Sequence, residues 1–364
     1  MKKDRREIPS SILFTALFTV VGVALLVAAR LSPGFAESYR GGFYSFLRAT
    51  IGSIVGLAPF SISEYLVPGV LALVLLDLIV HLIWRKHFKN FLKRFFVCLS
   101  LFFMLFAMNC GVNYYSKPFV DPETLATFEP SDALLTDFCE HIVSELNALD
   151  GAEYPEGKML RSVAVQSMIR LGRDHETLGG SYPEPKELSF SARFFSMSGV
   201  TGIYSPFLIE ANINGEMPQM NKPFTACHEL SHLKGYMNEG EANYIGWLAC
   251  VGSKNSGFQR SAWLAAWQYA GTALWRSDQT KYEELRAKLP ESARRELEED
   301  SAFWKEHKNK ASDIQDKVND AYLKANGQAD GIKTYGQLTD LMLLWYEANK
   351  STSTALLLEN SRPN

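Results

Sequence analysis

Three long apolar runs dominate the first third of the chain. They cover about residues 11–31, 66–84 and 93–112, and the first contains no charged side chain before Arg30. A helix of about 20 apolar residues is long enough to cross the hydrocarbon core of a bilayer. The pattern therefore predicts three transmembrane helices within residues 1–115, with the lipid bilayer as the partner of this part.

Two neighbouring features allow other interpretations of this region. A basic start before the first run also fits a secretory signal peptide, but the run is longer than a signal core and no small-residue cleavage motif follows. Residues 43–60 are apolar as well, yet they contain Arg48 and several Gly and Pro residues. We expect an interfacial or re-entrant helix there and not a fourth span.

One acidic and one imidazole side chain interrupt the second run. Asp77 and His81 are four residues apart and therefore share one face of a helix. Ionisable groups inside a span can mark a proton or ion path, whereas near a helix end they more simply form a paired polar terminus. We favour the paired terminus, since three helices alone make a thin transport pathway.

Basic residues set the expected orientation of the spans. They cluster before the first run, at residues 2–6, and between the second and third runs, at residues 85–94. Basic flanks stay cytoplasmic, so the N-terminus is predicted inside the cell and residues 116–364 outside the cytoplasm. This predicts a multi-pass protein of the plasma membrane.

The two parts of the chain differ in charge. Residues 1–115 hold 12 Lys and Arg against 5 Asp and Glu, which leaves 37 − 12 = 25 against 40 − 5 = 35 for the rest. The outer part is therefore acidic, with a net charge of 25 − 35 = −10. An acidic domain argues against a nucleic-acid partner.

The outer part is predicted to be mainly α, of the α+β class, with a small sheet. Apolar residues recur at helical spacing in residues 131–149 and 157–171, and helical patterns return after residue 249. Between them, residues 194–214 are rich in Gly, Pro and β-branched residues, and we expect two or three short strands, one at about 206–213. The five cysteines show no repeated spacing, so no disulfide scaffold is predicted.

The residues that carry chemistry lie in the segment 224–250. His228 and His232 are four residues apart, so on a helix both imidazoles project from one face and can bind the same Zn²⁺. Glu229 follows the first histidine directly. A carboxylate at this position can act as the general base that removes a proton from metal-activated water.

A third ligand is expected on a second helix. Gly235 can end the first helix in a left-handed cap, and Asn238 can cap the next helix through a contact with residue 241. In the resulting hairpin, Glu239 and Asn243 share a face. Glu239 is the favoured third ligand, and Asn243 is expected to orient a ligand histidine.

Glu241 is the competing candidate for the third ligand. It points roughly 160° away from Glu239 on an ideal helix, where its simpler role is capping. In a tight antiparallel hairpin, however, Glu241 lies nearer the level of His232 than Glu239 does. Both carboxylates therefore remain candidates for the third ligand. Asn238 also falls in the last position of a metzincin frame, His-Glu-x-x-His-x-x-Gly-x-x-His, but Asn is a poor zinc ligand.

The motif resembles that of the gluzincins. His-Glu-Leu-Ser-His followed by Glu-Gly-Glu-Ala-Asn is similar to their pattern, in which the ligand Glu begins a Glu-x-x-Ala-Asp/Asn helix. With three preceding spans, the chain resembles an uncharacterised family of bacterial membrane proteins that carry a zinc-peptidase-like domain of unknown function. The resemblance implies a bacterial plasma-membrane protein with Zn²⁺ on His228, His232 and Glu239 and with Glu229 as base. Only six residues separate His232 from Glu239, which departs from the better-known gluzincins.

The sequence therefore predicts a membrane-anchored zinc metallopeptidase that hydrolyses a peptide or protein substrate. A non-catalytic sensor or scaffold that binds a peptide or envelope ligand is the alternative. Substrates of such enzymes often bind along an edge strand, and residues 206–214 are the candidate edge, although ordinary sheet filling is as good an explanation. Candidate donors to the developing oxyanion are Tyr204, Tyr244 and Tyr335.

Overall fold

The computed structural model describes residues 9–84, 88–325 and 337–360. The chain divides into two compact units. The first, here called the membrane unit, is Met1–Lys117 together with Tyr204–Glu210, and the second, here called the outer unit, is Pro118–Ile203 together with Ala211–Asn364. One short segment of the outer sequence therefore packs within the membrane unit.

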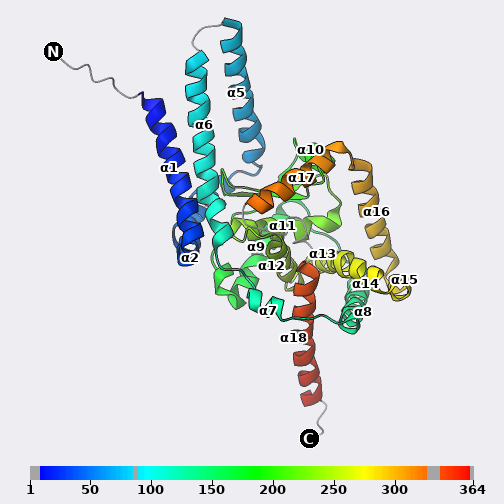
Figure 1. Ribbon diagram of the computed structural model, residues 1–364. Helices are drawn as coiled ribbons and strands as arrows, with labels where there is room; N and C mark the ends of the chain where they lie inside the picture. Colours follow the sequence, from blue (N-terminus) through cyan, green and yellow to red (C-terminus); the bar gives the residue numbers. More distant parts are fainter. Residues whose placement is uncertain (1–8, 85–87, 326–336, 361–364) are drawn as a thin grey trace, which may run out of the picture. The chain divides into compact units, whose positions relative to one another are not determined.

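Three helices of the membrane unit are long and apolar enough to cross a membrane. They are α1 (Ser10–Leu31), α5 (Ser63–Trp84) and α6 (Phe88–Asn109), which continues as a 3-10 turn, η3 (Gly111–Tyr115) (Figure 1). The three predicted apolar helices are confirmed. The direction in which they cross stays a prediction, and residues 1–8 and 85–87 of the two basic clusters lie outside the described residues.

The connection between α1 and α5 is almost entirely helical, as expected for residues 43–60. Its pieces are α2 (Pro33–Tyr39), the π-helical η1 (Arg40–Tyr44), α3 (Ser45–Leu47), the π-helical η2 (Arg48–Gly52) and α4 (Ser53–Gly56). The two π turns bring Arg40, Tyr44 and Arg48 into buried positions. Whether this segment lies at a membrane surface stays a prediction.

The segment Tyr204–Glu210 is held in the membrane unit by polar contacts. The hydroxyl groups of Tyr44 and Tyr204 are 2.9 Å apart, and Tyr204 also donates to the Asn109 carbonyl at 3.0 Å. The Glu210 carboxylate accepts hydrogen bonds at the start of α5 from Ser61 Oγ, Ile62 N and Ser63 N. These bonds satisfy N–H groups that have no partner within the helix. Ile209, buried beside them, has a φ of +54°, a conformation that a β-branched residue rarely adopts.

The polar residues of α5 are paired with α6. Arg94 of α6 donates from Nε and Nη2 to the Asp77 carboxylate at 3.0 and 2.6 Å, and His81 Nδ1 is 2.8 Å from the Asp77 carbonyl. Asp77 and His81 are thus paired with each other, as we favoured over an ion path. Arg94, which the sequence analysis did not single out, also pairs with the Asp77 carboxylate. The contact joins the two helices at one end.

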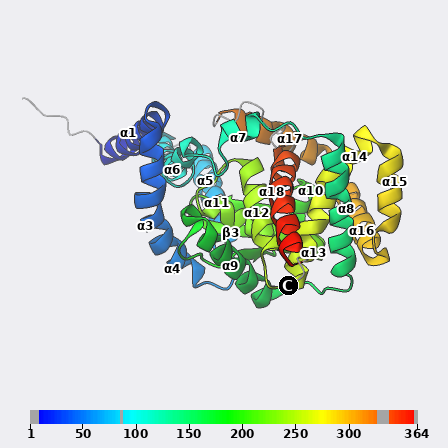
Figure 2. The ribbon, with the colours of Figure 1, turned by 90° about the horizontal axis from the view of Figure 1, so that it is seen from below.

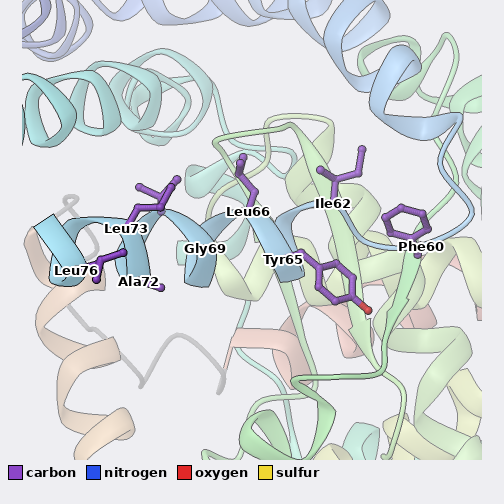
Figure 3. Close-up of a pocket in the computed structure, with 9 residues that line it drawn as sticks. Phe60, Ile62, Tyr65, Leu66, Gly69, Ala72, Leu73 and Leu76 are labelled. Carbon is purple, nitrogen blue, oxygen red and sulfur yellow. The ribbon is translucent and has the colours of Figure 1, made fainter.

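A shallow apolar groove of about 670 Å³ runs along α5. Its lining consists of apolar and aromatic side chains, as Figure 3 shows: Phe60, Ile62, Tyr65, Leu66, Gly69, Val70, Ala72, Leu73 and Leu76. Such a surface is what a helix presents to lipid. It brings together none of the histidines or carboxylates expected in an active site.

The outer unit is mainly helical with one small sheet, so the predicted class is confirmed at this level. Its helices are α7 (Pro122–Ala126), α8 (Asp132–Ala148), α9 (Gly157–Asp174), α10 (Ala192–Met197), α11 (Lys222–Leu233), α12 (Glu239–Val251), α13 (Ser256–Ala266), α14 (Thr272–Ser277), α15 (Gln279–Lys288), α16 (Glu291–His307), α17 (Lys310–Ala325) and α18 (Gln337–Asn360). Shorter turns are η4 (Glu176–Leu178), η5 (Gln219–Asn221) and the π-helical η6 (Trp267–Gly271). The helices expected at 131–149 and 157–171 are α8 and α9.

The sheet has three strands in the order β1-β3-β2. They are β1 (Lys186–Leu188), β2 (Gly202–Ser205) and β3 (Glu210–Asn214), and β1 runs parallel to β3 with Lys186 opposite Asn212. The proposed edge at residues 206–214 is therefore wrong, because β3 is the central, fully buried strand. Sequence could not order strands of three to five residues, since their pairing depends on long-range contacts.

Helices α11 and α12 form the centre of the outer unit. Helices α9 and α13 pack on both of them, and α18 packs on α12, as Figures 1 and 2 show. The fully buried Trp247 of α12 anchors this core, with its ring 5.0 to 6.5 Å from the rings of Phe138, Trp263 and Trp345. The hairpin predicted to carry the chemistry is thus held from several sides.

Candidate metal centre

The turn between α11 and α12 is built as the sequence predicts. Gly235 has a φ of +101°, the left-handed conformation of a helix C-cap, and the Tyr236 N–H donates back to the Ser231 carbonyl at 3.1 Å. Asn238 then caps α12, because its Oδ1 accepts from the Glu241 N–H at 3.1 Å. The two caps fix a tight helical hairpin.

The two helices approach unusually closely. A Cβ on Gly246 of α12 would lie 2.9 Å from N and 3.1 Å from Cα of His228, closer than real side chains come. Ala242, one turn earlier, is completely buried, as expected for a residue that permits close approach. Gly246 was missed by sequence reasoning, because a helical glycine signals close packing only when the neighbouring helix is known.

Three predicted ligands converge in this hairpin. One ligand atom from each of His228, His232 and Glu239 lies within 4.8 Å of the others. The Oε2 atom of Glu239 is 3.4 Å from Nε2 of His228 and 3.6 Å from Nε2 of His232. This is a group that could hold a metal ion, and it is the one such group among the described residues.

Glu241 faces another part of the outer unit. Its Oε1 accepts a hydrogen bond from the Phe119 N–H at 2.6 Å, on the segment that leads into α7. The structure therefore places Glu239, and not Glu241, beside the histidines. The concern about helix level does not apply, because α12 begins at Glu239 and this residue projects from the first turn toward α11.

Glu229 lies at the edge of the cluster without belonging to it. It is 2% exposed, and its Oε1 is 3.9 Å from Nε2 of His228. Its Oε2 is buried with no hydrogen-bond partner. Gly202 of β2 lies directly against it, since a Cβ there would be 2.5 Å from Glu229 Oε1. This contact could not be predicted from the sequence, because no motif around Gly202 indicates that β2 packs against α11.

The ionisable groups of the cluster shift one another strongly. Burial raises the pKa of Glu229 to about 8. Burial alone disfavours protonated His232, but the carboxylates of Glu239 and Glu229 and the Tyr236 carbonyl override it and raise the pKa to about 9. Burial opposes the charged form of Glu239 too, yet the two histidines hold its pKa well below the usual range. The pKa of His228 is lowered, first by burial.

The second nitrogens of the two histidines differ in their surroundings. His232 Nδ1 is 2.7 Å from the Tyr236 carbonyl, a contact that leaves Nε2 directed at the cluster. His228 Nδ1 is buried without a hydrogen-bond partner, and so is Nδ2 of Asn243. Asn243 is near enough to His228 to favour its protonated form slightly. The predicted neighbour is therefore in place, but the predicted orienting hydrogen bond is not formed.

The three tyrosines considered as oxyanion donors have other surroundings. Tyr204 is bonded within the membrane unit, Tyr244 stacks on Trp247 with ring centroids 6.1 Å apart, and Tyr335 lies outside the described residues. Tyr269 of η6 was not among the tyrosines considered from the sequence, but it is electrostatically coupled to Glu239. Burial and the negative charge of Glu239 raise the pKa of its phenol to about 12, so it lies in the electrostatic range of the cluster and stays protonated.

Comparisons with known proteins give a family and no function. A family model described as "Protein of unknown function (DUF3810)" matches residues 39–343. No curated protein and no solved structure matches the chain. The match includes α5, α6 and the candidate metal centre, whereas α1 lies before its first residue.

Uptake of a divalent metal ion at this site is expected to strengthen as the pH rises toward 9. Below that pH, His232 holds a proton that the ion must displace, and below about pH 8 the nearby Glu229 can release a second. Displacing one proton lowers the apparent dissociation constant about tenfold per pH unit. Titration calorimetry of the full chain at pH 6, 7 and 8 measures this slope and the released protons. A pH-independent affinity would contradict the pairing of His232 with Glu239.

Proposed function

We propose that this chain, which belongs to the DUF3810 family of proteins of unknown function, is a membrane-anchored zinc metallopeptidase. Its Zn²⁺ is held by His228, His232 and Glu239, and Glu229 is the general base. The membrane helices keep the enzyme in a bacterial plasma membrane with the N-terminus in the cytoplasm and the outer unit outside it. The resemblance to the gluzincin motif and the distribution of basic residues support these assignments.

The spacing of the donor atoms is the observation that carries the proposal. Tetrahedral zinc with bonds of about 2.0 to 2.2 Å separates its ligand atoms by roughly 3.3 to 3.5 Å. The two distances from Glu239 Oε2 to the imidazole nitrogens are 3.4 and 3.6 Å. Two histidines and one carboxylate, with a further position left open, are also a typical donor set of catalytic zinc.

Charge balance supports the same ion. The cluster holds two carboxylates, the buried Glu229 and the half-buried Glu239, and no Lys or Arg side chain pairs with either of them among the described contacts. A divalent cation held by neutral histidines would balance both negative charges. Without it, protons take that place, because burial raises the pKa of Glu229 and the neighbouring carboxylates raise the pKa of His232.

The reaction that fits these residues is hydrolysis of a peptide bond. Zinc bound by the three donors would acidify a water molecule and polarise the peptide carbonyl. Glu229 is beside the donors and has a free Oε2, so it can take a proton from the attacking water and pass it to the leaving amine. The missing side chain of Gly202 leaves room for this carboxylate, since a Cβ there would lie 2.5 Å from Glu229 Oε1. Tyr269, which stays protonated, can donate to the carbonyl oxygen as negative charge develops.

Replacing Glu229 tests the proposed chemistry. Glu229→Gln keeps the shape of the side chain but removes the base, so we expect zinc content to stay at the native level while cleavage falls about 10²- to 10⁴-fold. Cleavage is followed by mass spectrometry on a mixed peptide library with the zinc-loaded full chain in nanodiscs. Equal cleavage by native protein and variant contradicts the assignment. Peptide binding without any cleavage by the native protein supports the sensor or scaffold.

Replacing Tyr269 tests the proposed hydrogen-bond donor. Tyr269→Phe removes only the hydroxyl group, and loss of one donor to a developing oxyanion typically lowers kcat about 10²- to 10³-fold. KM and zinc content are expected to change little. Tyr244→Phe is the matched control, because its ring packs against Trp247 and Phe119 and not against the cluster. Similar kinetics for both variants would exclude Tyr269 from the reaction.

A further inference from the structure

The exposed large apolar side chains of the outer unit are concentrated on one surface. Nine are exposed among the described residues of that unit: Met159, Ile169, Phe190, Phe194, Met197, Ile203, Trp275, Ile314 and Val318. Six of the nine lie on α10 and its flanks, on β2, or on α17. We name this set the apolar patch, formed by Phe190, Phe194, Met197, Ile203, Ile314 and Val318.

Contacts between their segments join the end of α10 to the start of α17. Asn309, just before α17, donates from Nδ2 to the Met197 carbonyl at the end of α10 at 2.9 Å. A Cβ on Gly199 would lie 3.8 Å from Cβ of Ser312 in α17. Figure 1 shows α10 and α17 next to each other. The patch is therefore shared by elements more than 100 residues apart in the chain.

The patch exposes large apolar side chains to an extent that is typical of a binding surface. Phe190 and Phe194 are 74% and 68% exposed, and Ile314 and Val318 of α17 are 61% and 57% exposed. The last two are four residues apart, so they share a face of the helix. Scattered apolar residues on a surface need no explanation, but a group gathered on neighbouring segments, with two exposed phenylalanines, is typical of an interaction site.

The covalent connection of the patch to the membrane unit indicates that its partner is the lipid bilayer. Ile203 of the patch directly precedes Tyr204, whose hydroxyl donates to the Asn109 carbonyl at the end of α6, a helix apolar enough to cross a membrane. Phe207, three residues further, packs its ring 4.7 Å from the ring of Phe102 in α6. One end of the patch is thus covalently joined to residues that lie against a membrane helix.

The composition of the patch fits the boundary between lipid headgroups and acyl chains. Arg193, between the two exposed phenylalanines, has a side chain that is 77% exposed and lies 3.8 Å from the Glu216 carboxylate, and Lys317 is exposed between Ile314 and Val318. Aromatic and aliphatic side chains interleaved with basic ones are typical of segments that lie in a membrane interface. The cations can meet lipid phosphates while the apolar side chains enter the acyl region.

We propose that the apolar patch of α10, β2 and α17 inserts into the surface of the phospholipid bilayer that the membrane unit crosses. This lipid contact is independent of the proposed peptidase activity, because it involves none of the residues assigned to the metal or the reaction. It gives the outer unit a second attachment to the membrane besides the spans.

Photolabelling of the native full chain tests the proposal directly. The chain is reconstituted into nanodiscs of phospholipid that carries a diazirine near the headgroup end of one acyl chain, and adducts are located by mass spectrometry. We expect adducts in peptides covering 189–203 and 310–325 at least tenfold above those covering Met159 and Ile169 of α9 or Trp275 of α14. These control residues are apolar, exposed and in the same unit. Equal labelling of patch and control peptides would overturn the proposal.

Oxidation of two methionines provides a second, independent measurement. Met159 and Met197 are 59% and 42% exposed, so exposure alone predicts that dilute hydrogen peroxide converts both to sulfoxide at similar rates. In nanodiscs we expect Met197 to react at least fivefold more slowly than Met159. Equal rates would contradict burial in lipid. Protection of Met197 together with cross-links between two copies at the patch, and no lipid adducts, would assign the surface to self-association and also overturn the proposal.

Discussion

The close packing of α11 on α12 is the constraint on which the candidate site depends. Because Gly246 has no side chain, the backbone of α12 lies directly on His228, and the first turn of α12 carries Glu239 to within 3.6 Å of both imidazoles. The caps at Gly235 and Asn238 make the intervening turn short enough for this approach. A hairpin with a wider crossing would keep the same sequence motif but separate the donors.

The electrostatic consequence of this packing is a buried cluster in which charges must be compensated. Removing a carboxylate from water costs several kcal/mol unless an opposite charge or hydrogen bonds offset it. Protons can supply this compensation, since the neighbouring carboxylates raise the pKa of His232 to about 9 and burial raises the pKa of Glu229 to about 8. Glu229 Oε2 and His228 Nδ1 are buried without a hydrogen-bond partner, so the cluster is not fully compensated by the protein's own contacts.

Local chemistry could be predicted from sequence, whereas long-range placement could not. The three apolar helices, the Gly235 and Asn238 caps and the shared face of His228 and His232 follow from periodicity and spacing within about 25 residues, which also narrows the third ligand to Glu239 or Glu241. The choice of Glu239 over Glu241 needed the structure, because it depends on how α12 is rotated against α11. Gly202 and Tyr269 come from distant segments, and the central position of β3 depends on pairing with β1, so no local pattern could find them.

The central claim is that three side chains of one helical hairpin hold a zinc ion, and the zinc content of two matched variants measures it most directly. Glu239→Gln and Glu241→Gln remove one negative charge each from the first turn of the same helix. Loss of a direct ligand should weaken zinc binding by more than about a hundredfold. This exceeds the usual effect of losing a residue that only hydrogen-bonds to a ligand. We predict about one zinc per chain in the native protein and in Glu241→Gln, and none retained by Glu239→Gln after dialysis. Equal zinc in the two variants would contradict the account.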